Sequence, residues 1–161
     1  MVIGGTVPRA FSELTSMKTA AENLRLLVRI RGAMLRDRRE PDVSQPGALG
    51  KWTKKQILGH LCDSALNTHQ CLVRAQVGTG GLEFPGHDQD AWVRVQDYLN
   101  ADWDLLIDLW RSISLHMACV IEQLLADRLK TPCRIGGREA VTLRFLTEDY
   151  IKHLEHHLSL L

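Results

Sequence analysis

The sequence predicts an all-α protein, a four-helix bundle with a short extra helix before the third long helix. Apolar residues recur every three or four positions over four long segments, and groups of proline and glycine separate these segments. Each segment has one apolar stripe to bury, which a bundle achieves by packing the four stripes together. A chain of 161 residues suffices for one such core, so we expect residues 1–161 to form a single domain.

The first long helix is expected from about Leu14 to near Arg39. Its six arginines from Arg25 onward are interleaved with acidic residues, which is typical of a solvated face; a basic binding helix is the alternative. Two prolines and a glycine in segment 40–47 end it. Its apolar stripe comprises Leu14, Met17, Ala21, Leu24, Val28 and Leu35, with Leu27 and Met34 widening it.

The second long helix begins after Thr53 and runs to about Gln76. Thr53 followed by Gln56 is a capping box, in which each side chain pairs with a backbone amide at the helix start. The glycines of segment 78–81 end the helix. Its apolar face comprises Ile57, Leu61, Ala65, Thr68 and Leu72.

Two further long helices are expected in the second half of the chain. A short helix over 90–98 precedes the third long helix, which Asn100 or Asp102 caps. Segment 130–138 breaks the pattern and can form a small hairpin, and Thr142 begins the fourth helix. The third stripe comprises Leu106, Leu109, Trp110, Ile113, Met117, Val120, Ile121 and Leu124, and the fourth comprises Leu143, Leu146, Tyr150, Leu154, Leu158 and Leu161.

Composition and residue spacing argue against several kinds of partner and against an oxidising compartment. With 20 Lys+Arg against 19 Asp+Glu, the chain lacks the basic excess that nucleic-acid binding or an anionic membrane requires, so we expect neither partner. No apolar run reaches the roughly 18 residues of a spanning helix, and the first residues lack a signal-peptide pattern. The four cysteines have irregular spacings, which favours reduced, buried thiols in a cytoplasmic protein over disulfides or a cysteine zinc site.

Three histidines are candidates for a metal site. His153 and His157 are one turn apart on the fourth helix, about 40° from each other around its axis, and can ligate one ion. His60 lies on the shoulder of the second helix and can meet them at one mouth of the bundle. Three imidazoles would leave a coordination position open, as in catalytic sites, and suit zinc, nickel, iron or copper. The alternative is that the spacing is a coincidence on a solvent-facing surface.

Two segments resemble the signatures of a known family. Residues 52–64 (WTKKQILGHLCDS) and 150–158 (YIKHLEHHL) are similar to segments of the DinB superfamily, particularly its YfiT-like branch. Residues 85–92 resemble that branch's loop before its extra helix, and Leu115–His116 resemble a motif of its third helix. The resemblance covers about Lys51 to Leu161 and implies a DinB/YfiT-like four-helix bundle that forms a homodimer.

The same resemblance implies a site. Its metal ligands would be His60, His153 and His157, and the ion a divalent transition metal, zinc or nickel in the first place. Asp63 and Ser64 match the family's Asp-Ser pair. Asp63 is the candidate catalytic residue, because it can orient an imidazole or accept a proton; a hydrogen bond on the helix surface is the alternative.

Four other residues are weaker candidates near this site. Asp149, four residues before His153, can anchor that ring's second nitrogen, or it can be a simple exposed acid. His116 can face the same mouth or be an interhelical histidine. His87 can belong to a lid or be an exposed loop residue. His156 points about 100° away from a neighbouring ligand, so we expect it in the outer shell or on the surface.

The function that the resemblance implies is that of a metal-dependent enzyme acting on a small molecule. The ion would activate water for hydrolysis, or a low-molecular-weight thiol such as bacillithiol or mycothiol for S-transfer. The alternatives are a non-catalytic, metal-dependent small-ligand-binding or stress-associated protein, and a helical interaction module with incidental histidines.

Overall fold

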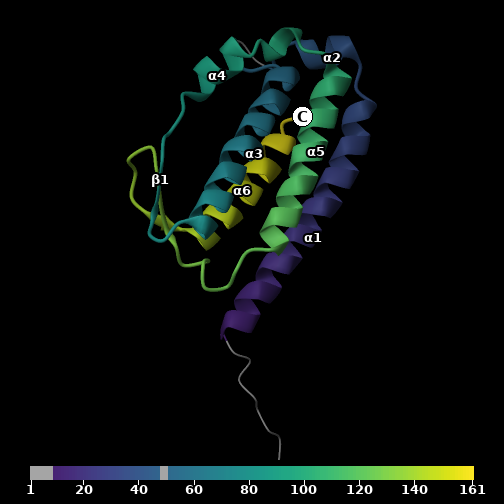
Figure 1. Cartoon of the computed structure of the whole chain (residues 1–161). Coiled ribbons are helices and arrows are strands. Elements are labelled where there is room, and N and C mark those ends of the chain that lie inside the picture. The colour runs from purple at the N-terminus through teal and green to yellow at the C-terminus, as the bar shows by residue number, and fades with distance from the viewer. Residues whose placement is uncertain (1–8, 48–50) are drawn as a thin grey trace, which may run out of the picture.

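The structure, a computed structural model, describes residues 9–47 and 51–161. Four long helices run side by side as a bundle (Figure 1), which confirms the predicted fold class. They are α1 (Arg9–Arg36), α3 (Lys54–Val77), α5 (Trp103–Glu122) and α6 (Leu143–Leu158). The short elements are α2 (Glu40–Ser44), β1 (Leu82–Phe84), α4 (Gln89–Val95), the 3-10 helix η1 (Tyr98–Asn100), β2 (Pro132–Ile135) and β3 (Val141–Thr142).

The core lies where the apolar stripes of the long helices meet. α5 packs against both α1 and α3, and α6 packs against α3 (Figure 1). Burying one large apolar side chain contributes about 1.5–3 kcal/mol, so these stripes dominate the stability. The α3–α6 contact determines which histidines can meet. The largest fully buried side chains include Met17, Leu24, Leu61, Leu72, Ile107, Trp110, Met117, Ile121 and Leu143.

Side-chain caps start the helices that carry the site. The predicted capping box of α3 is confirmed: Thr53 Oγ1 accepts from the Gln56 amide at 3.2 Å, and the Thr53 amide donates to Gln56 Oε1 at 2.9 Å. Each such cap contributes about 1 kcal/mol. The other caps are Asp88 for α4, Asp102 rather than Asn100 for α5, and Thr142 for α6.

Two boundaries differ from the prediction. α1 ends at Arg36, and the segment where prolines were expected to exclude a helix contains the short helix α2. Pro41 lies in the first turn of α2, where its missing N–H would have no helical partner in any case. The helix predicted over 90–98 ends at Val95, because Asp97 adopts a left-handed conformation with φ 50° and turns the chain into η1.

A small sheet packs against α3 and α6. The hairpin predicted within 130–138 forms but extends beyond that segment: β2 pairs antiparallel with β3, and the turn between them uses Gly136 and Gly137 at positive φ (60° and 72°). The parallel pairing of β1 with β2 has no local signal in the sequence, and places Leu82 opposite Cys133. The sheet tethers the loop that leads to His87 and α4.

Some residues that the apolar pattern predicts to be buried are exposed. Met34 is 48% exposed and Leu109 is 42% exposed. Both lie at the edge of an apolar stripe, where the adjacent helices do not cover the full width of the stripe. All four cysteines are free, as expected, but Cys119 is exposed while the other three are buried. Within residues 9–47 and 51–161, no helix has both the length and the apolar composition needed to cross a membrane.

Candidate metal centre

Three histidines from two helices meet at the α3–α6 contact. One ring nitrogen from each of His60, His153 and His157 lies within 4.8 Å of the other two, and no other group of this kind occurs among the described residues. His60 Nε2 lies 3.2 Å from His153 Nε2. Two nitrogens bound to one tetrahedral zinc ion at about 2.05 Å would be roughly 3.4 Å apart. The spacing therefore fits two imidazoles that share an ion.

The environment keeps these rings neutral. Burial, together with the neighbouring histidines, lowers the pKa of His60 to about 4. Burial and the same kind of neighbours lower the pKa of His157 to about 4. The pKa of His153 is also lowered, mainly by burial, with Asp149 opposing the shift. Since a metal binds the deprotonated imidazole, all three rings are ready to act as ligands at neutral pH.

Two of these rings keep one nitrogen unpaired. His60 Nδ1 and His157 Nδ1 are buried, and neither finds a hydrogen-bond partner in the described part of the chain. An ion bound at His60 Nε2 would not satisfy Nδ1 of the same ring, so the fit to a divalent ion rests on the neutral rings and their spacing.

Ser64 and not Asp149 contacts the second nitrogen of His153. Ser64 Oγ lies 3.4 Å from His153 Nδ1, one turn beyond His60 on α3. Of the two possibilities for Asp149, the exposed acid is the one observed: its side chain is exposed, and it forms no hydrogen bond with His153, although both residues are described. With Nδ1 directed at Ser64, Nε2 of His153 is left for the ion.

Removing the Ser64 hydroxyl should therefore weaken metal binding without unfolding the protein. For Ser64→Ala we expect zinc affinity to fall roughly 10- to 100-fold, because a residue that orients a metal-binding histidine typically contributes that much. Competition with a chromophoric chelator measures it, and Ser112→Ala on exposed α5 is the control. Unchanged affinity in Ser64→Ala would show that His153 needs no such partner.

Asp63 lies one turn from His60 but is turned toward η1. Its Oδ1 accepts hydrogen bonds from Tyr98 Oη at 2.8 Å and from Gln96 Nε2 at 2.7 Å. It is buried and is not among the residues that line the pocket. The carboxylate thereby ties the end of α4 and η1 to α3. This placement supports a role in holding the wall of the site.

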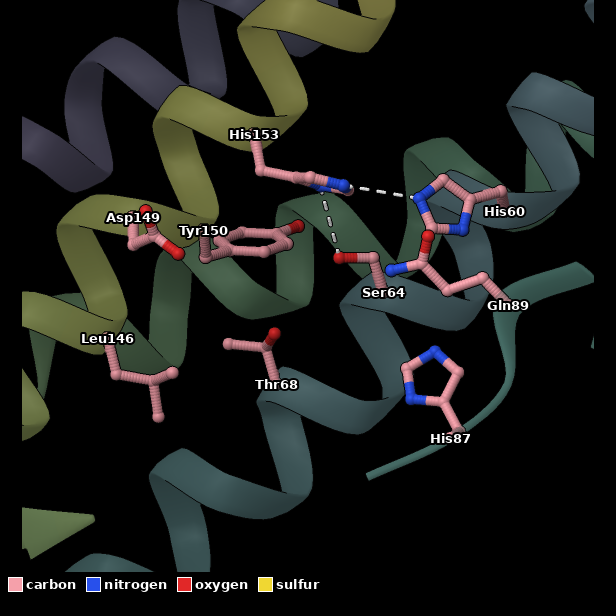
Figure 2. A pocket seen from close by; sticks show the side chains of 9 residues that line it. All are labelled: His60, Ser64, Thr68, His87, Gln89, Leu146, Asp149, Tyr150 and His153. Carbon is pink, nitrogen blue, oxygen red and sulfur yellow. Dashed lines mark hydrogen bonds between the residues drawn. The ribbon is translucent and has the colours of Figure 1, made fainter. Parts of the chain in front are cut away.

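A pocket opens beside the histidines. It has a volume of about 150 Å³, and Figure 2 shows side chains from α3, from α6 and from the segment at the start of α4 around it. Gln89 was not a candidate from the sequence, because only the folding of the loop after β1 brings it here. The lining residues are His60, Ser64, Thr68, His87, Gln89, Leu146, Asp149, Tyr150 and His153.

The remaining histidines divide between this pocket and other surfaces. His87 lines the pocket and packs on Trp92, with 4.7 Å between the ring centroids. His116 does not face the pocket; its ring lies 5.1 Å from that of His69, across the α3–α5 contact. His156 is exposed, as expected, and packs edge-on against His157.

Acid should destabilise the metal-free protein in a defined range. The pKa of His60 and of His157 is about 4 in the folded state, against an ordinary value of 6.5 for histidine, so both side chains take up protons on unfolding between these pH values. The unfolding free energy should fall as the pH is lowered from 6.5 to 4, by up to about 1.4 kcal/mol per pH unit for each such histidine.

Urea unfolding of chelator-treated protein at several pH values measures this dependence. The His60→Gln variant should lose part of the slope between pH 6.5 and 4, because it removes one titrating group. An equal slope in the variant and the wild type would contradict the assignment of buried neutral rings.

Comparisons with known proteins show what this chain is similar to. A family model described as the DinB superfamily matches residues 16–161. A Bacillus licheniformis protein named "Putative metal-dependent hydrolase" is 27% identical over 124 residues, which cover 74% of this chain and 68% of the relative. The solved structure of YfiT from Bacillus subtilis, described as a probable metal-dependent hydrolase with an unusual four-helix bundle topology, matches with a TM-score of 0.67 at 18% identity, over 99% of this chain and 87% of that one.

Proposed function

Because this chain belongs to the DinB superfamily, we propose that it is a metal-dependent hydrolase of small molecules, with the ion bound by His60, His153 and His157. The observation that carries the proposal is the meeting of three neutral imidazoles beside a pocket, with 3.2 Å between two of the donor nitrogens. The names of the two relatives support the same class of reaction. Zinc and nickel both suit a set of three imidazoles.

The chain's own residues hold and shape the site. A divalent ion bound there would lower the pKa of a coordinated water, and so supply a nucleophile at neutral pH. Ser64 orients His153, and Trp52 packs against His60 with 5.0 Å between ring centroids, so both rings are fixed. Three protein ligands would leave a coordination position for water or substrate, as in catalytic zinc sites.

The size of the pocket favours water over a large thiol as the nucleophile. A cavity of about 150 Å³ holds a molecule the size of benzene. A sugar-linked thiol is several times larger and would leave most of its atoms outside. Hydrolysis of a small ester or amide is therefore the reaction that we propose, and S-transfer is the outcome that the test must distinguish.

The experiment uses protein made without a polyhistidine tag, stripped with a chelator and reloaded with Zn²⁺ or Ni²⁺. The loaded protein is assayed on small nitrophenyl esters and anilides, with and without added thiol. We expect turnover that requires the metal, proceeds without thiol and disappears in His157→Ala, while His156→Ala on the same helix remains active. Turnover only with thiol would replace hydrolysis by S-transfer, and failure to bind either metal would overturn the proposal.

A further inference from the structure

The pocket beside the histidines has an uneven charge. Asp149 is the one acidic residue among its lining side chains, and no lysine or arginine lines it. The lining side chains therefore supply one carboxylate and no lysine or arginine to balance it.

That carboxylate has no partner in the part of the chain that the structure describes. No cation there forms an ion pair with Asp149 and no donor forms a hydrogen bond with it, whereas Glu148 next to it is paired with Arg144 at 2.8 Å. Asp149 is exposed at the pocket's edge, so it is hydrated until a ligand arrives. An unpaired charge at the edge of a small pocket is free to select a ligand of opposite charge.

Asp149 lies one helical turn from the metal-ligand candidate His153. It precedes His153 by four residues on α6, which places their Cβ atoms about 5–6 Å apart. Figure 2 shows Asp149 and Leu146 on one side of the pocket, with Gln89 and His87 on the other. A separation of one turn suits a ligand whose charged group and metal-binding group are joined by a short spacer.

Resting on the proposed function, we infer that the substrate of this pocket is a small ester or amide carrying an ammonium group, which pairs with Asp149 while the scissile carbonyl lies at the three histidines. Hydrolysis adds the oxygen of water to the carbonyl carbon and breaks the bond to the leaving nitrogen or oxygen. The leaving group takes one proton from the same water, so no oxidant or reductant is needed. An anionic substrate would instead bring its charge toward Asp149.

Three hydroxamates of similar length test the preference for charge, because hydroxamates chelate the ion whether or not catalysis occurs. They are 3-aminopropanohydroxamic acid (an ammonium), butanohydroxamic acid (neutral) and malonic monohydroxamic acid (a carboxylate). Their Kd values are measured by calorimetry on the zinc-loaded protein. We expect the ammonium compound to bind about fivefold more tightly than the neutral one, as one partly exposed ion pair allows, and the carboxylate compound to bind most weakly.

Two variants separate the role of Asp149 from a general effect of charge. Asp149→Asn should make the ammonium and neutral compounds bind equally, whereas Glu155→Gln, an exposed acid on the same helix, should keep the preference. Equal binding of all three compounds by the wild type, or a preference that survives in Asp149→Asn, would overturn the inference and leave the hydrolase proposal standing. Failure of the wild type to hold zinc, or to bind any hydroxamate once loaded, would overturn the proposed function itself.

Discussion

Replacing His60 with alanine is expected to lower the affinity for zinc by more than about 100-fold. Loss of a partner that only orients a ligand costs about 10- to 100-fold, and loss of a direct ligand should exceed that. His60 is the one ligand on α3, and its Nε2 lies 3.2 Å from His153 Nε2, so no other side chain of that helix replaces it. Chelator competition and elemental analysis measure the affinity and the stoichiometry.

A matched control shows whether zinc affinity falls because a ligand is lost or because any histidine is removed. His116→Ala removes an exposed histidine that pairs with His69 away from the site, and it should keep one tightly bound ion. The fold should survive in both variants, since alanine is compatible with helices α3 and α5. Equal zinc affinity in His60→Ala and His116→Ala would refute the ligand set.

Replacing Gly59 with alanine is expected to destabilise the protein by about 2 kcal/mol or more, although alanine is the better helix former by about 1 kcal/mol. A Cβ at Gly59 would lie inside the van der Waals radius of the Tyr98 ring, which packs flat against this turn of α3. To make room, Tyr98 must move and abandon its hydrogen bond to Asp63. Urea unfolding of the wild type and the variant measures the change.

Two controls test whether the contact with Tyr98 causes this loss of stability. Gly32 lies inside α1, and its Cβ would meet Arg111 Cδ at 2.8 Å, a flexible side chain that can move away. Gly32→Ala should therefore be neutral or slightly stabilising. In a Tyr98→Ala background, Gly59→Ala should also lose its cost, because the obstructing ring is gone. A cost that persists in that background would contradict the proposed contact.

Local signals predicted the bundle well. The three-to-four-residue periodicity and the caps at Thr53, Asp102 and Thr142 act within one or two turns of chain, so the sequence contains them directly. The pairing of β1 with β2 joins Leu82 to Cys133 and has no comparable local signal. The single-domain organisation and the homodimer stay predictions.

Part of the site could be predicted from the sequence for the same reason. The one-turn spacing of His153 and His157 makes a shared ligand position visible in the sequence, whereas the approach of His60 depends on how α3 packs against α6. Side-chain direction was the harder part. Asp63 turns to Tyr98, and Ser64, rather than Asp149, lies beside the second nitrogen of His153.

Anomalous diffraction from crystals of the zinc-loaded protein, recorded on both sides of the zinc absorption edge, tests the central claim most directly. We expect one strong peak between α3 and α6, within about 2.0–2.2 Å of one ring nitrogen of each of His60, His153 and His157. No peak at that position, or a peak at the His69–His116 pair in its place, would contradict the account.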